Sequence, residues 1–302
     1  MMIELEKLST EENNLNSKDI ELQDSLEIVR RINEEDKKVA FCVEKELGSI
    51  SRLIDAILSK YKKETRIIYI GAGTSGRLGI LDASECPPTY GVSFEKVQGI
   101  IAGGNEAIFK AKENAEDKPE LGRQDLININ LAENDVVIGL AASGRTPYVL
   151  RAIEYANSIG AITGSITCSE SSDLSKVSQY PIEVPVGAEI VTGSTRMKAG
   201  TAQKMILNMI STTIMIKLGK VFSGYMVDVK TSNQKLIERA KRIIMKTANC
   251  DYEKASDTLK KSGNDVKTAI VMILLNIDKD MAAEKLNQCD ENVAKIIHEN
   301  LK

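Results

Sequence analysis

The sequence has no tryptophan and a single histidine, His298, which lies four residues from the carboxyl end. The stretch around it is polar and helical in pattern, so we expect an exposed side chain. A Ser-His-Asp triad, a Cys-His pair or a histidine-rich metal site would have to rest on this one residue, which rules out most chemistry of that kind. Carboxylates or lysines must therefore carry any proton transfer.

Cysteine is scarce and scattered. Five cysteines occur without any Cys-x-x-Cys pair, so the sequence predicts neither a zinc site nor a disulfide framework. We expect reduced thiols, no bound metal and a cytoplasmic location. The five residues are Cys42, Cys86, Cys168, Cys250 and Cys289.

Long apolar runs and basic clusters are also missing. The longest uncharged apolar run, 205–216, is too short to span a bilayer and predicts a buried helix. The charged amino end lacks the apolar segment of a signal peptide. A formal net charge of −3, with no basic run and no interleaved aromatics, gives no feature of a nucleic-acid-binding protein. We therefore expect neither a membrane nor a nucleic acid as partner.

What the sequence does contain is a central region rich in glycine and proline between two helical flanks. All six prolines lie within 87–185, and only Gly48 and Gly263 fall outside the glycine-rich range 71–224. Short apolar runs alternate there with helical windows, which is typical of a parallel sheet covered on both faces. The strands are predicted at 67–70, 97–102, 136–140, 162–167 and 181–186.

The pattern predicts an α/β fold with a five-stranded parallel sheet. If the strand order is the flavodoxin-like 2-1-3-4-5, a ligand crevice opens between the first and third strands. We expect an amino-terminal arm with helices over 1–55, the sheet domain over 56–225 and a helical region over 226–302. In the amino-terminal flank, one helical face carries Leu22, Leu26, Val29 and Ile32.

The first strand leads into the densest glycine motif of the chain, Gly71-Ala-Gly-Thr-Ser-Gly-Arg-Leu-Gly79. Its glycines allow a tight turn into a helix that is predicted to start near Ser75, where free N–H groups and hydroxyls favour an anion. The pair Pro87-Pro88 predicts that this helix ends before residue 87. Glu85 would then lie in the last turn as a candidate acid.

Two further segments combine hydroxyl side chains with a helix start. After the third strand comes Ala142-Ser-Gly-Arg-Thr-Pro147, in which Thr146 is predicted as the N-cap, so that a second helix start faces the same crevice. The segment Thr192-Gly-Ser-Thr-Arg-Met-Lys-Ala-Gly-Thr201 opens a long helix that is predicted to reach about Val221. Its hydroxyls and two cations also favour an anion.

Two nucleotide-binding motifs fit the first loop less well. The spacing Gly71-x-Gly73-x-x-Gly76 matches the dinucleotide fingerprint, but residues 101–105 lack the acidic residue that binds ribose. A P-loop needs lysine and then serine or threonine after Gly76, where this chain has Arg77-Leu78. A small phosphomonoester fits better than either. Glycines that serve only tight turns are an equal alternative for one loop, and two loops at one crevice favour the ligand.

Several long motifs make the sequence resemble the N-acetylmuramic acid 6-phosphate etherases, from the amino-terminal arm to the carboxyl end. The resemblance implies a sugar isomerase (SIS) type three-layer sandwich and a homodimer. The motifs are the Gly71–Gly79 segment, Asp82-Ala-Ser-Glu-Cys-Pro-Pro-Thr-Tyr-Gly91, Ala141-Ala-Ser-Gly-Arg-Thr-Pro-Tyr148, Val186-Gly-Ala-Glu-Ile-Val-Thr-Gly-Ser-Thr-Arg-Met-Lys-Ala-Gly-Thr-Ala-Gln-Lys204 and Met226-Val-Asp-Val229.

The resemblance implies a carbon–oxygen lyase of cell-wall recycling. Such an enzyme cleaves the lactyl ether of N-acetylmuramic acid 6-phosphate with water and gives N-acetylglucosamine 6-phosphate and D-lactate. By analogy, Glu85 is the proton donor to the lactyl oxygen, and Glu116, from an Ala-Glu-Asp motif, is the base at C2. The reverse assignment of the two roles is the alternative. No metal or redox cofactor is expected, because an ether β to the open-chain aldehyde can leave by elimination.

The substrate-binding residues are predicted in the three hydroxyl-rich segments. Arg77 and Arg145 each have two alternatives, contact with an anion or pairing with a carboxylate. The predicted substrate-binding residues are Gly73, Thr74, Ser75, Ser143, Gly144, Arg145, Thr146, Ser194 and Lys198.

Two other functions remain for an SIS protein. A sugar-phosphate-sensing regulator needs the phosphate loops but not two acids, and the amino-terminal flank shows no basic recognition helix. An aldose-ketose isomerase shares the fold and the ligand, but would often use a histidine to open the sugar ring, and only His298 is present.

The carboxyl-terminal flank is predicted to be helical from about residue 231. Three short helices are expected over 250–302, with breaks near 262–264 and 287–288. They resemble a ubiquitin-associated three-helix bundle, and in an enzyme of this kind the resemblance implies packing against the main domain or a second subunit rather than ubiquitin binding.

Overall fold

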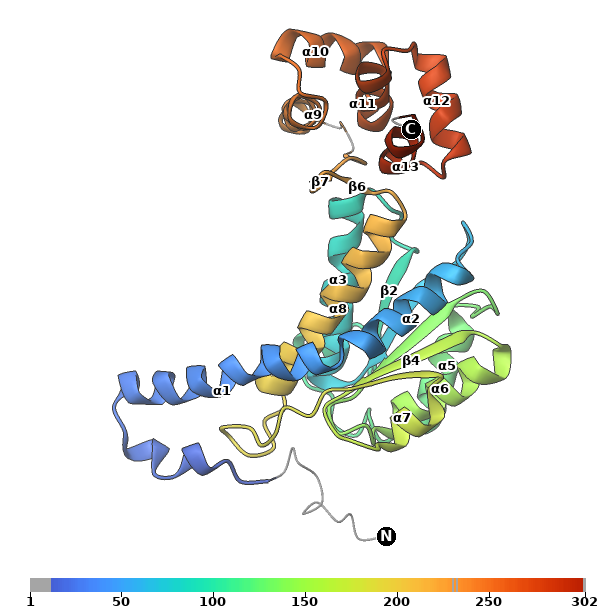
Figure 1. Ribbon diagram of the computed structural model, residues 1–302. Coiled ribbons are helices and arrows are strands. Elements are labelled where there is room, and N and C mark those ends of the chain that lie inside the picture. The colour runs from blue at the N-terminus through green and yellow to red at the C-terminus, as the bar shows by residue number, and fades with distance from the viewer. Residues whose placement is uncertain (1–11, 230, 232, 301–302) are drawn as a thin grey trace. The chain divides into compact units, whose positions relative to one another are not determined.

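The computed structural model describes residues 12–229, 231 and 233–300 (Figure 1). The chain divides into two compact units. The first unit contains the described residues up to Ser84 together with Phe94–Ile210, and the second contains Glu85–Ser93 together with the described residues from Ser211 onward. The three-part division expected from the sequence stays a prediction.

The first unit is built on a five-stranded parallel sheet in the order β2-β1-β3-β4-β5, which confirms the predicted flavodoxin-like order. Ile67 of β1 is aligned with Val97 of β2 on one side and with Val136 of β3 on the other. Every residue of β1 and β3 is buried, as expected for strands covered on both faces. The strands are β1 (Ile67–Gly71), β2 (Val97–Ile101), β3 (Val136–Leu140), β4 (Ile162–Thr167) and β5 (Tyr180–Glu183).

Helices cover both faces of the sheet and form the predicted three-layer sandwich (Figure 1). On one face, α5, α6 and α7 share a core with β1 and β3 that includes Leu126, Val149 and Val137. On the other face, Leu53 of α2 packs over Gly164 of β4, and Gly79 of α3 lies directly against Tyr69 of β1. The helices are α2 (Leu47–Ser59), α3 (Gly73–Tyr90), α4 (Glu106–Phe109), α5 (Pro119–Asn128), α6 (Pro147–Ile159), α7 (Asp173–Val177) and α8 (Lys198–Lys217).

Helix α3 does not end before its proline pair, so that prediction was wrong. The helix contains Pro87 and Pro88 and continues to Tyr90. Proline removes the N–H that would bond four residues back, but its fixed φ is compatible with a helix, and only the last turns lose these bonds. The helix stops at Gly91, whose φ of +68° is left-handed and whose N–H donates to the Pro87 carbonyl at 3.0 Å. Glu85 is therefore followed by more than one further turn.

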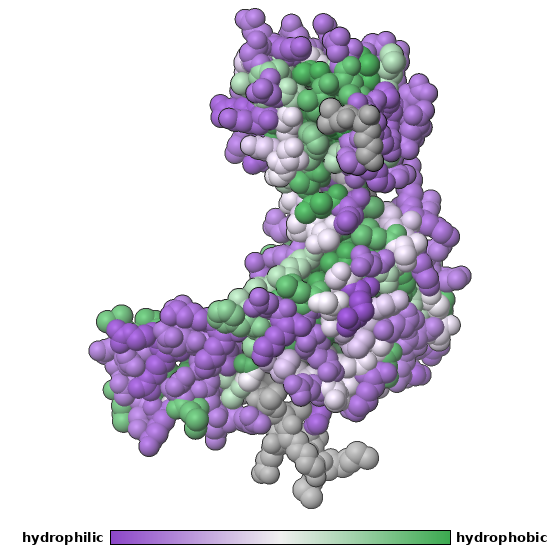
Figure 2. Space-filling view, in the orientation of Figure 1, coloured by the Kyte–Doolittle hydropathy of each residue, from purple (hydrophilic) through white to green (hydrophobic). Residues whose placement is uncertain are grey.

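From residue 12 onward the amino-terminal flank is helical as predicted, and its apolar stripe is exposed; the first part of the predicted arm, 1–11, lies outside the described residues. Leu22, Leu26 and Val29 are 78%, 64% and 56% exposed, although such a stripe is normally buried. Hydrophobic side chains are visible on the surface at the outer end of α1 (Figure 2). The elements are the 3₁₀ turns η2 (Leu15–Ser17) and η3 (Ile20–Leu22) and the helix α1 (Ser25–Lys45).

The second unit contains a short hairpin and a helical bundle. Within 251–300 the structure has four helices, where three were predicted. Asn276 adopts a left-handed φ of 52°, and the Asp278 side chain caps a new helix by accepting from the Met281 N–H. No helix among the described residues is long and apolar enough to cross a membrane. The elements are β6 (Val221–Phe222), β7 (Tyr225–Met226), α9 (Gln234–Ala248), α10 (Tyr252–Lys261), α11 (Val266–Leu275), α12 (Lys279–Gln288) and α13 (Val293–Asn300).

Candidate active site

The first predicted loop lies at the carboxyl end of β1, where the strand order reverses. Helix α3 begins at Gly73, two residues earlier than predicted, and Gly73 has a left-handed φ of 53°. Ser75 is buried, and its hydroxyl donates to Oε1 of Gln203 on α8 at 2.8 Å. The Nε2 of Gln203 is buried and has no hydrogen-bond partner within the described part of the chain. Gln203 was not selected from the sequence, although it lies within one of the etherase-like motifs.

The second predicted loop follows β3 and leads into α6. Thr146 is the N-cap residue and Pro147 the first helical residue, as predicted, but the Thr146 hydroxyl makes no capping hydrogen bond. Gly144 has a φ of 65°, and a Cβ placed there would lie 2.3 Å from the Ser172 side chain. Ser143 and the exposed Arg145 line a cavity of about 540 Å³ with the segment 169–173. The loop is therefore packed closely against Ser172 at Gly144, whereas Ser143 and Arg145 face the open cavity.

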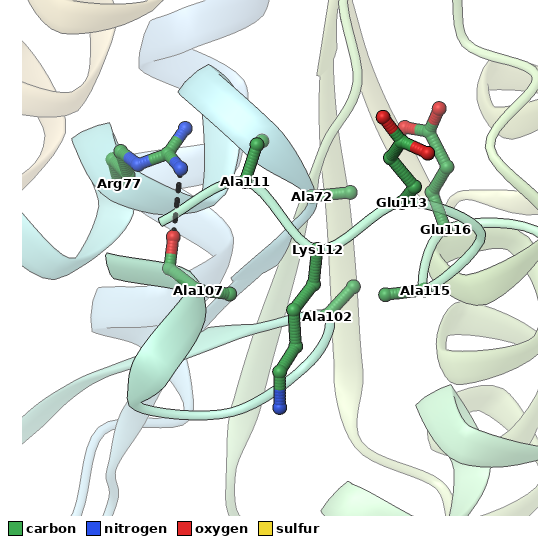
Figure 3. A pocket seen from close by; sticks show the side chains of 10 residues that line it. Ala72, Arg77, Ala102, Ala107, Ala111, Lys112, Glu113, Ala115 and Glu116 are labelled. Atoms are coloured by element: carbon green, nitrogen blue, oxygen red, sulfur yellow. Dashed lines mark hydrogen bonds between the residues drawn. The ribbon is translucent and has the colours of Figure 1, made fainter. Parts of the chain in front are cut away.

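Glu116 lies at the same crevice. It lines a cavity of about 230 Å³ next to the first loop, and its carbonyl oxygen accepts a hydrogen bond of 3.0 Å from the Tyr148 N–H in the first turn of α6. The Glu113 and Glu116 side chains point to the same side of this cavity (Figure 3). The structure thus brings the Ala-Glu-Asp segment next to the first loop and to the first turn of α6, whereas Ser143 and Arg145 of the second loop line the other cavity. The cavity is lined by Ala72, Gly73, Arg77, Ala102, Ala107, Ala111, Lys112, Glu113, Ala115 and Glu116.

Arg77 has a partner that sequence analysis did not consider. Its Nε donates to the Ile108 carbonyl at 2.9 Å and its Nη2 to the Ala107 carbonyl at 2.8 Å. The second of these bonds is drawn in Figure 3. These two carbonyls belong to α4, so Arg77 joins α3 to the segment after β2.

The third predicted segment is neutralised by carboxylates of the chain itself. The two carboxylate oxygens of Glu189 accept hydrogen bonds from the backbone N–H groups of Lys198 and Ala199, both at 3.0 Å, and so cap α8. The Lys198 Nζ lies 2.7 Å from Oε2 of Glu35 on α1, and both side chains are only 3% exposed. The Glu189 carboxylate therefore occupies the anion position at the start of α8. The substrate roles of Ser194 and Lys198 stay predictions.

Glu35 is the most strongly perturbed carboxylate of this region. Burial alone would raise its pKa, but hydrogen bonds from Lys198, Lys38, Asn14 and Asn16 together lower the pKa to about 2. Glu35 therefore stays ionised beside Lys198. Sequence reasoning could not find this pair, because its partners are 163 residues apart.

Glu85, the other predicted acid, is exposed on α3 and belongs to the second unit. Within that unit the helix end that follows it is fixed by Gly91 and by the Tyr90 hydroxyl, which donates to Thr212 at 3.2 Å. The segment 85–91 thus has a defined conformation and presents a carboxylate to solvent.

Comparison with known proteins identifies the family. Residues 49–157 match the glucokinase regulatory protein N-terminal SIS domain, and residues 115–213 match the SIS domain. An N-acetylmuramic acid 6-phosphate etherase of Clostridium botulinum (strain Eklund 17B / Type B) is 55% identical over 293 residues, 97% of each chain. The etherase of Clostridium beijerinckii is also 55% identical, over 98% of each chain. This chain belongs to the N-acetylmuramic acid 6-phosphate etherase family.

One solved structure is similar in fold at the level of the sheet domain. A Bacteroides fragilis protein, assigned as a phosphosugar isomerase involved in capsule formation, aligns with a TM-score of 0.50 at 18% identity. The alignment covers 68% of this etherase-family chain and 98% of that chain. At this identity the likeness shows the fold alone, and it confirms the SIS-type sandwich predicted from the motifs.

Proposed function

We propose that this chain is a carbon–oxygen lyase that cleaves the D-lactyl ether of N-acetylmuramic acid 6-phosphate with water. The products are N-acetylglucosamine 6-phosphate and D-lactate, as required in the recycling of cell-wall peptidoglycan. The near full-length identity to etherases carries this proposal. The position of Glu116 beside two helix starts at the sheet crevice supports it, because a sugar phosphate held there would lie next to a carboxylate.

The reaction is an elimination followed by a hydration. The open-chain sugar has an aldehyde at C1, which makes the proton on C2 acidic, and the lactyl oxygen is attached to C3. The Glu116 carboxylate removes the C2 proton, the C3–O bond breaks, and protonated Glu85 gives its proton to the lactate oxygen. Water then adds to the C2–C3 double bond, with hydroxide at C3 and a proton at C2. Carbon is neither oxidised nor reduced overall.

The 6-phosphate would be bound by the starts of α3 and α6, where unpaired N–H groups meet hydroxyl side chains. Because the Ser75 hydroxyl already donates to Gln203, Ser75 would contribute its backbone N–H. Ser194 and Lys198 are further candidates for the same pocket, although Lys198 would first have to leave its ion pair with Glu35. The proposed binding residues of the two loops are Gly73, Thr74, Ser75, Ser143, Gly144, Arg145 and Thr146.

We also propose a homodimer and a cytoplasmic location. The exposed apolar residues Leu22, Leu26 and Val29 support a partner surface, since a second chain would remove them from water. All five cysteines are unpaired thiols, which suits a reducing compartment.

The direct test is incubation of the purified chain with N-acetylmuramic acid 6-phosphate, followed by an enzymatic assay for D-lactate. Stoichiometric D-lactate and N-acetylglucosamine 6-phosphate are expected. A sugar-phosphate sensor would bind the substrate without releasing lactate, and an isomerase would convert an aldose phosphate to its ketose. Either result without lactate would reject the proposal.

A further inference from the structure

Alanine is the commonest residue in the lining of the cavity beside Glu116. Five of its ten lining residues are alanines, which come from three segments of the chain, and its charged residues Lys112, Glu113 and Glu116 are exposed. Ala102 and Ala107 are each 4% exposed, and the Cβ atoms of Ala102 and Ala115 point toward each other (Figure 3). The alanines are Ala72, Ala102, Ala107, Ala111 and Ala115.

These walls are fixed before any ligand arrives. Ala102 and Ala115 belong to the buried core between the sheet and α6. Ala107 is held through its carbonyl oxygen by the Arg77 guanidinium at 2.8 Å. The cavity is therefore a preformed apolar recess, of the kind that selects a small ligand group by shape.

The charged residues that line the recess come from two segments, with Arg77 on α3 and the others within 112–116. Lys112 forms an ion pair of 2.9 Å with Glu106, which directs its charge to the surface. Glu113 and Glu116 lie on the opposite edge, with their carboxylates on the same side (Figure 3). A methyl group of a ligand would fill an apolar recess of this kind. The carboxylate beside the recess could then remove a proton from an acidic C–H that lies close to the methyl group.

Geometry restricts what can enter this recess if Glu116 is the base at C2. A general base must lie about 3 Å from the proton it removes. The acetamido group is attached to the same carbon, and the two carbons on either side of a trans amide are about 3.8 Å apart. The acetyl methyl must then lie within about 7 Å of the carboxylate. The alanine recess is the apolar cavity that the structure provides next to Glu116.

We propose that the alanine recess receives the N-acetyl group of the substrate and selects 2-acetamido sugars. This inference rests on the proposed function, because it assigns the base at C2 to Glu116. Ala111 determines the size of the group accepted, since it lines the recess and is exposed, so a larger side chain there fills the recess without disturbing the core.

The test compares an acetylated ligand with its free amine, which is a cation near neutral pH, so each ligand is compared with itself between protein variants. Binding of N-acetylglucosamine 6-phosphate and of glucosamine 6-phosphate is measured by calorimetry for the unmodified protein and for Ala111→Leu. We expect Ala111→Leu to weaken the acetylated ligand about tenfold or more and the amine by less than about twofold. Ala283→Leu, at an exposed alanine of α12, is the matched control and should change neither value.

A second variant tests the opposite direction. Ala111→Gly enlarges the recess, so N-propionylglucosamine 6-phosphate should gain affinity relative to the acetyl ligand by about threefold to tenfold. An equal loss for both ligands in Ala111→Leu, or no loss for either, overturns the recess assignment. The second outcome is also expected if the recess holds the lactyl group, which neither ligand contains.

Lactate release separates this inference from the proposed function. If the unmodified protein releases no D-lactate, the proposed function fails whatever the binding ratios are. If it releases D-lactate but Ala111→Leu leaves the ratio of the two affinities unchanged, only the recess assignment fails.

Discussion

The backbone N–H of Tyr148 donates a hydrogen bond of 3.0 Å to the carbonyl oxygen of Glu116. Tyr148 is itself fully buried, and its hydroxyl donates to Oδ2 of Asp125 on α5 at 2.6 Å. Burial, and then the bond to Asp125 and its charge, raise the pKa of Tyr148 well above the ordinary 10. A Cβ at Gly122 of α5 would lie 2.0 Å from the Tyr148 carbonyl oxygen, so the two helices are in close contact. One tyrosine therefore connects the Glu116 segment to α5 and α6.

We predict that Tyr148→Phe lowers kcat with little change in KM. The variant loses the bond to Asp125 and leaves that carboxylate without its donor, which costs about 1–3 kcal/mol of unfolding free energy. The backbone N–H that binds the Glu116 carbonyl is kept, so we expect the base to lose alignment only through a shift of residue 148 once its side chain is no longer bonded to Asp125. D-lactate kinetics and chemical denaturation measure the two effects. Tyr225→Phe, at a tyrosine 40% exposed in the second unit, is the control and should leave both unchanged.

The roles of the two glutamates can be separated by isotope exchange at C2. If Glu116 is the base, Glu116→Gln should abolish both D-lactate release and exchange of the C2 proton with D₂O. Glu85→Gln should also abolish lactate release, by at least about a hundredfold, but it should keep C2 exchange and nearly intact sugar-phosphate binding. NMR of the substrate in D₂O follows the exchange. Glu253→Gln, at an exposed glutamate of α10, serves as control. Exchange retained in Glu116→Gln and lost in Glu85→Gln would reverse the assignment.

The sheet could be predicted because its signals are local. Each strand is a short apolar run followed by a turn, and the predicted bounds of β3 and β4 agree with the structure to the residue. The helix through Pro87 and Pro88 could not be predicted by the same rules, because the end of α3 depends on Gly91 rather than on the prolines. The propensity of proline describes its average effect on helices, whereas the residue at which one particular helix ends depends on its C-terminal cap.

The candidate site could be predicted only where a motif within one short segment of the chain indicated it. The loops at Gly73 and Thr146 follow from glycine and hydroxyl content, but Glu116 was distinguished from its acidic neighbours by resemblance alone. The partners of Arg77, Lys198 and Ser75 are far away in sequence, with separations of 30, 163 and 128 residues. No pattern within a short window can indicate such contacts, and they decide which polar groups are free to bind a ligand.

We predict that Glu35→Gln destabilises the protein near neutral pH and that this difference shrinks as the pH falls below about 4.5. The pKa of Glu35 is lowered from 4.5 to about 2 in the folded state, so ionised Glu35 contributes stability above pH 4.5. This contribution is lost as the pH falls from about 4.5 toward 2. The variant leaves Lys198 buried without its counter-charge, and a loss of about 3 kcal/mol is expected at pH 7.

Urea denaturation between pH 3 and pH 7 measures this difference. Glu34→Gln is the matched control, since Glu34 pairs with Lys37 on the exposed side of the same helix and should contribute less than about 0.5 kcal/mol. A Glu35→Gln penalty that stayed constant across the whole range would show that the ion pair is not its source.

Gly144→Ala should impair phosphate binding more than its backbone conformation alone explains. Gly144 has a left-handed φ of 65°, and the added Cβ would lie 2.3 Å from the Ser172 side chain. The strain of a left-handed alanine costs about 1–2 kcal/mol, and the contact with Ser172 would in addition shift the loop that ends at Thr146. Gly224→Ala provides the strain alone, because Gly224 has a φ of 79° with nothing within 4 Å of its added Cβ.

We expect Gly144→Ala to be the less stable of the two variants. We also expect it to bind N-acetylglucosamine 6-phosphate about tenfold more weakly than the unmodified protein does, because a displaced loop no longer points its N–H groups at the phosphate. Calorimetry and thermal unfolding of the two variants side by side decide the matter, and equal behaviour would mean that the loop after β3 does not bind the phosphate.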